Sequence, residues 1–267
     1  MSEIATTSIV DKSARIGKNV CIGHFCVIGA DVCIGDNTTI HNNVTIVGHT
    51  TLGTGNTIFP GAVLGTQPQD LKYAGEPTEL RIGDNNIIRE FTTFNPGTAN
   101  GKSLTQIGSN NLFMAYTHIA HDCNIGSHCV FSNNASLAGH IEIGDYVTIG
   151  GLSGIHQFVR IGKGAMLAGA SALGQDVPPF CIAQGNHATL KGLNRYRMRQ
   201  LLEREEIDKI AALYKRLFSG KEVVREAAED CLHSNKPYSE LVAQFCEFVL
   251  QSTRGIPVIN RTRKDDE

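Results

Sequence analysis

The chain has 267 residues, an apolar content of 41% and a net charge of −2, so it can bury a core and is not, as a whole, a polyanion binder. Its start, Met-Ser-Glu-Ile, has no basic segment before an apolar stretch, and no run of about 18 apolar residues follows, which predicts a soluble cytoplasmic protein. The eight cysteines are scattered and form no CxxC pair, which favours buried free thiols over a disulfide framework.

A six-residue repeat begins at Ile4 and dominates the first two thirds of the chain. Ile, Val, Leu or Phe recurs every sixth residue from Ile4 to Leu64, again from Ile82 to Phe94, and again from Ile107 to Leu173. A period of six fits neither an α-helix nor an ordinary strand, and it is typical of a parallel β-helix. Three hexapeptides then form one triangular coil, with the large aliphatic residue pointing inward. Asn19, Asn37, Asn43, Asn85 and Asn110 fall at the expected turns, where positive φ is needed.

Two segments lack the repeat, residues 66–81 and residues 95–106. A solenoid carries such insertions as external loops, often on its binding face.

The pattern becomes helical after the repeat ends near Val177-Pro178-Pro179. Apolar residues keep one face of a single helix that ends at Ser219-Gly220, and two more helices are expected near 221–232 and 239–252, with residues 256–267 frayed. We therefore expect an all-β parallel β-helix over residues 1–190 and an α-helical C-terminal domain over residues 191–267 that caps the solenoid.

The 18-residue coil places several polar residues in vertical columns. His121 is expected below Gly139 and Gly139 below Gln157, with Asp122 below His140 and His156 above Ala138. His118 lies three residues before this patch. Four of the ten histidines gather here, which is more than a solvated coil surface requires.

Histidine is suited to proton transfer near neutral pH. His121 is our candidate for the general base that takes the proton of an acceptor hydroxyl. Gly139 has no side chain to cover its N–H, which suits an oxyanion donor. Asp122 can orient the imidazole only if it stands at a turn, because neighbouring strand residues face opposite sides.

Two other readings concern the histidines and the segment that follows the repeat. Clustered histidines can bind zinc, but the His118-x2-His121 pair differs from the His-x4-His pair of zinc-dependent hexapeptide proteins. Residues 186–200 carry four basic residues and no acid, which is typical either of a solvated helix start or of a patch for phosphates or an acidic carrier protein.

Several motifs resemble the UDP-N-acetylglucosamine O-acyltransferase family of lipid A biosynthesis. The segments that carry the resemblance are Gln69–Pro77, Thr117–Cys123, Asn133–Ala135, Leu137–His140, His156–Phe158, Gln175–Pro179, Ala183–Thr189 and Ser252–Gly255. Asn95 departs from the family, which often has His there, and the run from Arg195 to Leu202 departs as well.

The resemblance implies a left-handed coil, a homotrimer, and transfer of a 3-hydroxyacyl group from acyl carrier protein to the 3-hydroxyl of UDP-N-acetylglucosamine. It implies no cofactor, no metal and no covalent enzyme intermediate. It carries over His121 as base, Asp122 as its partner and Gly139 as oxyanion donor. It also carries over the following positions as substrate-binding residues: Asp70, Lys72, His118, His140, His156, Gln157, Asn194 and, loosely, Arg199.

Gly169 matches the family position associated with acyl-chain length. It lies 48 residues beyond His121, which is about 13 Å further along the coil axis, and Gly151 is expected directly beneath it.

Three alternatives stay open. The acceptor can carry a 3-amino group in place of the 3-hydroxyl. A related N-acyltransferase would need a further domain before the solenoid, for which a repeat that starts at Ile4 leaves no room. A binding solenoid without catalysis would not need the histidine patch.

Overall fold

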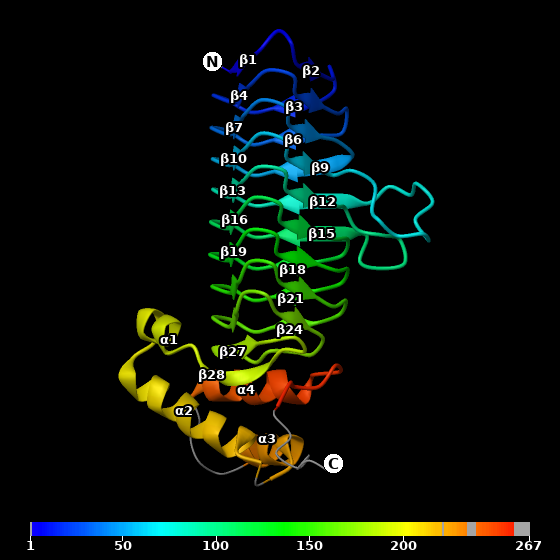
Figure 1. Cartoon of the computed structure of the whole chain (residues 1–267). Helices are drawn as coiled ribbons and strands as arrows, with labels where there is room; N and C mark the ends of the chain where they lie inside the picture. Colours follow the sequence, from blue (N-terminus) through cyan, green and yellow to red (C-terminus); the bar gives the residue numbers. More distant parts are fainter. Residues whose placement is uncertain (1, 221, 234–238, 259–267) are drawn as a thin grey trace.

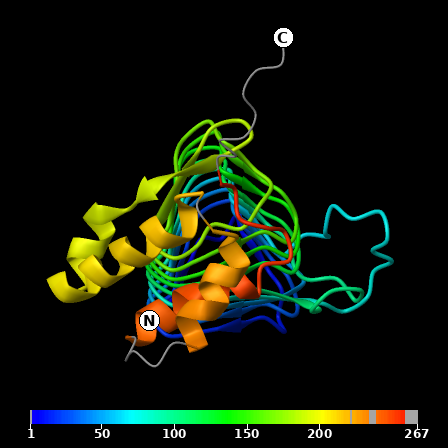
Figure 2. The same cartoon turned by 90° about the horizontal axis from the view of Figure 1, so that it is seen from below.

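The computed structural model describes residues 2–220, 222–233 and 239–258. The chain winds into a three-sided parallel β-helix with helices at its C-terminal end, and the coil is triangular when seen along its axis (Figures 1 and 2). The predicted fold class, a left-handed parallel β-helix followed by an α-helical segment, is confirmed.

The three sides are three sheets, which we name A, B and C. Sheet A contains β1 (Glu3–Ile4), β4 (Cys21–Ile22), β7 (Thr39–Ile40), β10 (Thr57–Ile58), β13 (Ile87–Ile88), β16 (Leu112–Phe113), β19 (Val130–Phe131), β22 (Thr148–Ile149), β25 (Met166–Leu167), β27 (Cys181–Gln184) and β28 (Thr189–Leu193). Sheet B contains β2 (Ile9–Val10), β5 (Val27–Ile28), β8 (Thr45–Ile46), β11 (Val63–Leu64), β14 (Thr93–Phe94), β17 (His118–Ile119), β20 (Ser136–Leu137), β23 (Gly154–Ile155) and β26 (Ala172–Leu173). Sheet C contains β3 (Arg15–Ile16), β6 (Cys33–Ile34), β9 (His49–Leu52), β12 (Glu79–Ile82), β15 (Leu104–Ile107), β18 (Asn124–Ile125), β21 (Glu142–Ile143) and β24 (Arg160–Ile161).

The chain visits the sheets in the order A, B, C, so three columns of turns form the corners. We call them the A/B, B/C and C/A corners after the sheets that each one joins. The predicted 18-residue register is present, for example between Ile22 and Ile40. Across the two loops the offset grows, so that Leu52 pairs with Ile82 and Ile82 with Ile107. Residues of one corner column therefore stand above one another through the whole solenoid.

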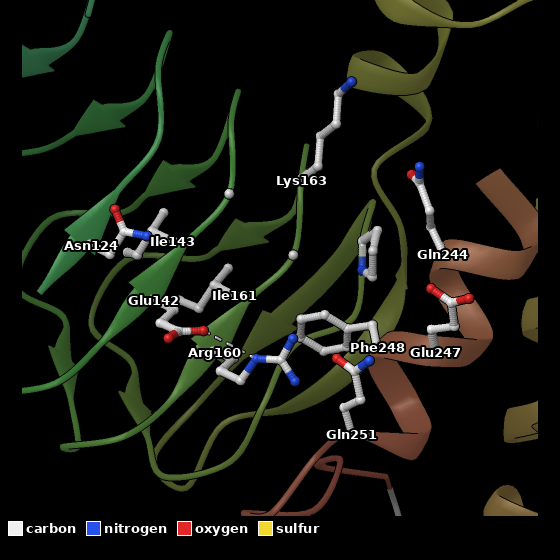
Figure 3. A pocket seen from close by; sticks show the side chains of 13 residues that line it. Asn124, Glu142, Ile143, Arg160, Ile161, Lys163, Gln244, Glu247, Phe248 and Gln251 are labelled. Carbon is white, nitrogen blue, oxygen red and sulfur yellow. Dashed lines mark ion pairs between the residues drawn. The ribbon is translucent and has the colours of Figure 1, made fainter. Parts of the chain in front are cut away.

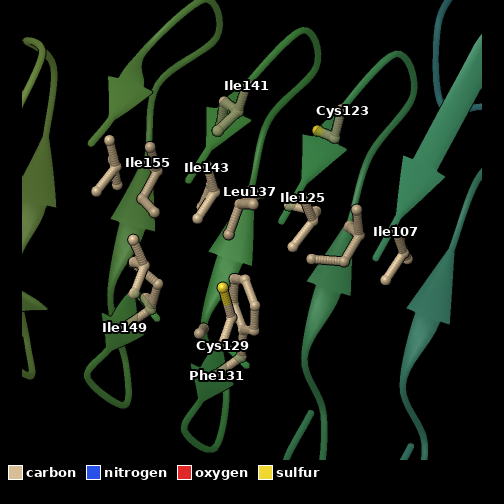
Figure 4. Packing of buried hydrophobic residues seen from close by; sticks show 14 of the residues in the cluster. Ile107, Cys123, Ile125, Cys129, Phe131, Leu137, Ile141, Ile143, Ile149 and Ile155 are labelled. Atoms are coloured by element: carbon tan, nitrogen blue, oxygen red, sulfur yellow. The ribbon is translucent and has the colours of Figure 1, made fainter. Parts of the chain in front are cut away.

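The core is the column of inward aliphatic and aromatic residues that the repeat predicted (Figure 4). Phe113 stacks on Phe131 with ring centroids 4.7 Å apart, and Phe94 meets Phe113 edge to face at 4.8 Å. The first coil is the exception, because no coil lies beneath it: Ile4 is 43% exposed, and Val10 and Ile16 are only partly buried. The five predicted turn asparagines all have φ between 55 and 61°, so the left-handed turn conformation is confirmed.

The two segments without the repeat protrude from the B/C corner as loops, seen on one side of the solenoid in Figure 1. Their predicted C-terminal bounds were wrong by three residues. Residues 79–81 and 104–106 already belong to β12 and β15, which are four residues long where most strands have two. The second loop is also less external than expected, because its residues 95–98 are buried.

The C-terminal segment forms α1 (Arg195–Leu201), α2 (Arg204–Phe218), α3 (Val224–His233) and α4 (Glu240–Leu250). The prediction of one helix up to Phe218 was wrong, because the chain is extended at Leu202 and Glu203. The charges explain the break. Arg199 lies in the last turn of α1 and Glu205 and Glu206 in the first turn of α2, and each end matches the helix dipole.

The helices lie across the C-terminal end of the coil (Figure 1). The predicted fraying is wrong for residues 256–258, since Leu190 N donates to Pro257 O at 2.8 Å, and residues 259–267 lie outside the described part of the chain. The division into domains at residues 190 and 191 stays a proposal, supported by the change from β28 to α1 between Leu193 and Arg195.

Within the described residues, none of the helices is long and apolar enough to cross a membrane.

Candidate active site

His121 and Asp122 form a hydrogen-bonded pair at the B/C corner, between β17 and β18. Asp122 has φ of 60°, so it stands at a turn, the condition under which it can face its neighbour. Its Oδ2 lies 2.8 Å from Nδ1 of His121. An ionised carboxylate only accepts, so Nδ1 carries the hydrogen and Nε2 keeps its lone pair. The pair thus has the geometry of a base with an orienting acid.

The carboxylate of Asp122 is fully buried beneath the second loop. Thr98 Oγ1 donates to Oδ2 at 2.7 Å, and Thr98 N approaches both oxygens at 3.2 Å. Lys102 N donates to Oδ1 at 2.7 Å. The backbone is fixed as well, since Asp122 N donates to Thr105 Oγ1 at 2.8 Å.

These donors decide the protonation of the pair. Burial alone would raise the pKa of Asp122, but the hydrogen bonds from Thr98, His121 and Lys102 outweigh it and hold the pKa below its ordinary value. The carboxylate therefore stays ionised near neutral pH and can stabilise a protonated imidazole.

Gly139 covers one face of the His121 imidazole, which confirms the predicted column. A Cβ at Gly139 would lie 2.5 Å from Cε1 and 2.8 Å from Nε2 of His121. The Gly139 N–H forms no hydrogen bond within the part of the chain that the structure describes. A reacting carbonyl oxygen beside Nε2 would therefore find an unoccupied donor.

The remaining predicted residues of the patch lie around this pair. His140 stands above Asp122, with its Nδ1 3.9 Å from Oδ2, and its ring stacks on Phe158 at 4.5 Å. His118 faces outward from β17, with Nδ1 2.7 Å from Thr93 Oγ1. Burial is the main reason that the pKa values of His118 and His140 are lowered, so both imidazoles are neutral and polar at neutral pH.

His156 and Gln157 continue the same corner one coil further and are exposed. Asp70 and Lys72 lie in the first loop, where Lys72 N donates to the Asp70 carboxylate at 3.0 Å. The charge of Asp70 raises the pKa of His140 slightly, against the larger lowering by burial.

Asn194 and Gly169 lie on other corners of the solenoid, and Arg199 lies in the last turn of α1. Asn194 caps α1 at the C/A corner, where its Oδ1 accepts from Arg197 N at 3.1 Å and its Nδ2 donates to Gly164 O at 3.0 Å. Gly169 lies at the A/B corner, and its Cβ would contact Gly151 O at 3.3 Å, as the predicted stacking requires. Within one chain these residues do not join the His121 patch, so their predicted roles stay predictions.

Three donor groups of the patch are close enough together to suggest a metal site. Ligand atoms of His121, Asp122 and His140 lie within 4.8 Å of one another, the one such group among the described residues. An ion bound through Nδ1 of His121 would replace the hydrogen of the 2.8 Å contact with Asp122 and break that hydrogen bond. We therefore assign the geometry to a hydrogen-bonded pair.

This assignment predicts that chelation leaves turnover unchanged. Dialysis against a strong chelator removes a zinc ion from an imidazole and carboxylate site, but it does not disturb a His–Asp hydrogen bond. Turnover before and after dialysis is the measurement, with the metal content determined in parallel. Loss of turnover that zinc restores would contradict the assignment.

A separate pocket of about 360 Å³ lies between sheet C and α4 (Figure 3). It contains Arg160, which is 3.4 Å from Glu142 and stands over the Phe248 ring at 4.7 Å. None of the predicted site residues lines this pocket.

Sequence reasoning missed Phe158, Thr98 and Thr105. Phe158 was within reach, because it lies 18 residues after His140. Thr98 and Thr105 were not, because the second loop interrupts the 18-residue count.

Comparisons with known proteins agree with the motifs. A family model described as UDP-N-acetylglucosamine O-acyltransferase, domain 2, matches residues 176–257, and one described as bacterial transferase hexapeptide matches residues 13–48 and 104–139. The chain is 58% identical over 258 residues to the acyl-[acyl-carrier-protein]–UDP-N-acetylglucosamine O-acyltransferase of Helicobacter pylori strain J99, covering 96% of this chain and 94% of that protein.

Two solved structures are similar over nearly the whole chain. One UDP-N-acetylglucosamine acyltransferase is 57% identical, with a TM-score of 0.93 over 97% of this chain and 99% of that chain. The enzyme from Campylobacter jejuni is 41% identical, with a TM-score of 0.92 over 97% of this chain and 100% of that one.

Proposed function

Because the chain belongs to the UDP-N-acetylglucosamine O-acyltransferase family, we propose that it transfers a 3-hydroxyacyl group from acyl carrier protein to the 3-hydroxyl of UDP-N-acetylglucosamine, the first step of lipid A biosynthesis. The observation that carries the proposal is the His121–Asp122 pair, against whose imidazole Gly139 packs, with no hydrogen bond to the Gly139 N–H among the described residues. The eight free thiols suit a reducing compartment, which supports a reaction in the cytoplasm.

The reaction follows from the geometry of this pair. His121 Nε2 takes the proton of the 3-hydroxyl while the oxygen attacks the thioester carbonyl. Asp122 stabilises the imidazolium through Nδ1, and the Gly139 N–H donates to the oxyanion of the tetrahedral intermediate. The intermediate expels the carrier thiol, which receives the proton from His121. No group on the protein becomes acylated.

We propose that the active enzyme is a homotrimer, and the charges on the three sheets support this. The outward residues of sheet B carry no Asp, Glu, Lys or Arg, and those of sheet A carry only Glu3 in the first strand and Lys191 in the terminal antiparallel strand β28. Sheet C has four charged residues at equivalent positions, namely Arg15, Arg81, Glu142 and Arg160. Sheet C is thus suited to solvent, and sheets A and B to contact with other copies.

The exposed apolar side chains point to the same surface. Four large apolar side chains stand at the A/B corner and are 53 to 71% exposed, namely Phe25, Phe91, Tyr116 and Leu152. A closed ring that packs sheet B of one copy against sheet A of the next covers this corner. It also brings the B/C corner of one copy, with His121, towards the C/A corner of its neighbour, with Asn194 and Arg199. The distant predicted residues then share one cleft.

A trimer predicts a mass near three times 28.8 kDa by light scattering. Leu152→Lys places a charge in the proposed contact and is expected to reduce both the trimer fraction and the turnover. Thr51→Lys on sheet C is the matched control and is expected to change neither. A monomer with full turnover would contradict the proposal.

The acceptor and the acyl length are properties of the same site. A 3-amino analogue of the sugar is the alternative acceptor, and the relatives named as O-acyltransferases favour the hydroxyl. Gly169 stays our proposed ruler, with the acyl chain crossing between copies towards the A/B corner. Turnover of both acceptors with hydroxyacyl carriers of several lengths tests the two assignments, and a preference for the amino sugar would overturn the first.

A further inference from the structure

The second loop is the least expected part of the site, because it approaches the buried side of the catalytic pair. Thr98 is 2% exposed and Asp122 is fully buried, so no solvent lies between them. Asp122 Oδ2 has two short partners, His121 Nδ1 at 2.8 Å and Thr98 Oγ1 at 2.7 Å. His121 Nδ1 and Thr98 Oγ1 both donate to this one oxygen. The position of the Thr98 hydroxyl therefore determines which lone pair of Oδ2 faces His121.

The loop is built to keep Thr98 in place. Thr98 O accepts from Gly101 N and Ser103 N, both at 3.0 Å, which closes the loop on itself. Gly97 N donates to Glu79 O at 3.1 Å, and a Cβ at Gly97 would overlap the backbone of Leu104. The hydroxyl is therefore held by a rigid turn.

The outer end of the loop is fastened to sheet C. Lys102 N donates to Asp122 Oδ1, and Lys102 Nζ forms an ion pair with Glu142 Oε1 at 2.8 Å. A Cβ at Gly101 would collide with the Asp122 carboxylate, so the loop can approach this closely only with glycine there. The contacts on both sides of the carboxylate come from one loop.

We propose that Thr98 is a positioning residue for the acyl transfer, acting through Asp122 to set the orientation and the charge that His121 faces. This inference rests on the proposed function. Thr98 reaches no substrate, because its hydroxyl is buried against the carboxylate. Its role is to occupy one lone pair of Oδ2, so that the other is directed at Nδ1 of His121.

Thr98→Val tests the proposal, because valine keeps the shape and the backbone N–H but removes the hydroxyl. We expect kcat to fall about tenfold, the size expected for one hydrogen bond to a charged group, with KM nearly unchanged. We also expect the acid limb of the pH profile of kcat/KM to move to higher pH. A carboxylate that has lost this donor presents more negative charge to His121 and so stabilises its protonated form. Thr98→Ser restores the hydroxyl and is expected to recover most of both effects.

The other titratable or charged groups around the pair are unchanged in these variants. They are His118 from β17, His140 from the next coil, Lys102 from the second loop with its partner Glu142, and Asp70 from the first loop. The thiol of Cys123, whose pKa burial raises to about 12, does not titrate in the working range.

Thr92→Val is the matched control. Thr92 is also fully buried, and its hydroxyl donates to a turn carbonyl, Arg89 O, at 3.1 Å. We expect Thr92→Val to lower the melting temperature without moving the pH profile.

The outcomes separate this inference from the proposed function. If the wild-type chain transfers no acyl group, the proposed function fails. If the wild type is active and Thr98→Val keeps its kcat and pH profile, the positioning role is wrong. If Thr98→Val and Thr98→Ala both fail to fold while Thr98→Ser folds, the hydroxyl serves stability and the inference is overturned.

Discussion

Replacing His121 with alanine is expected to lower kcat at least 10²-fold, the lower end of the contribution of a general base. The His121 imidazole has its Nδ1 bound to the ionised Asp122 carboxylate, which leaves the lone pair of Nε2 to accept a proton. KM for the sugar nucleotide should change far less, because the base acts on the proton in the transition state. Steady-state kinetics on the purified variant is the measurement.

The fold of this variant should be unaffected, since the His121 side chain is at the surface of a coil and not in the inward column. His233→Ala, which removes an exposed imidazole from α3, is the matched control and should behave as the wild type. Turnover of His121→Ala within a few-fold of the wild type, with a melting curve that matches, would rule out His121 as the base.

Gly139→Ala is expected to be nearly as damaging, although it adds one methyl group and keeps the N–H. The new Cβ would stand 2.5 Å from Cε1 of His121, a distance that real Cβ atoms do not adopt, so the imidazole must turn away. A displacement of about 1 Å of a catalytic group costs about 10²-fold in rate. We expect that loss in kcat, with the melting temperature within a few degrees of the wild type.

Gly174→Ala is the control for this substitution. Gly174 also follows a strand of sheet B, but a Cβ there has no heavy atom within 4 Å. It should leave kcat unchanged. If Gly139→Ala turned over at the wild-type rate, the imidazole that acts as base would not be the one packed against Gly139.

The periodic part of the molecule could be predicted from the sequence because one physical rule repeats. Each inward residue is determined by the coil alone, so Ile22, Phe94 and Leu173 lie where the six-residue count placed them. The column of His121 and Gly139 followed from the same count. Ile4 departed only because the first coil has no neighbour beneath it.

The non-periodic contacts could not be predicted, and they complete the site. Thr98 reaches Asp122 across 24 residues through an irregular loop, and no spacing rule relates the two. The break at Leu202 was predictable in principle, because basic residues before it and acidic residues after it mark a helix end and a helix start. In the proposed trimer, the corners occupied by Asn194 and Gly169 contribute to the site only through contacts between copies, which residue spacing along one coil does not indicate.

In the proposed mechanism His121 acts as a base and the acyl group passes directly from carrier to sugar. A single labelling measurement tests it. The wild-type enzyme is mixed with carrier protein that bears a radiolabelled 3-hydroxyacyl group, first alone and then with UDP-N-acetylglucosamine. We expect no label on the enzyme at any time, and label on the sugar as an ester at the 3-position once the nucleotide is added. Label on the enzyme chain before the nucleotide is added, or no labelled sugar afterwards, would contradict the account.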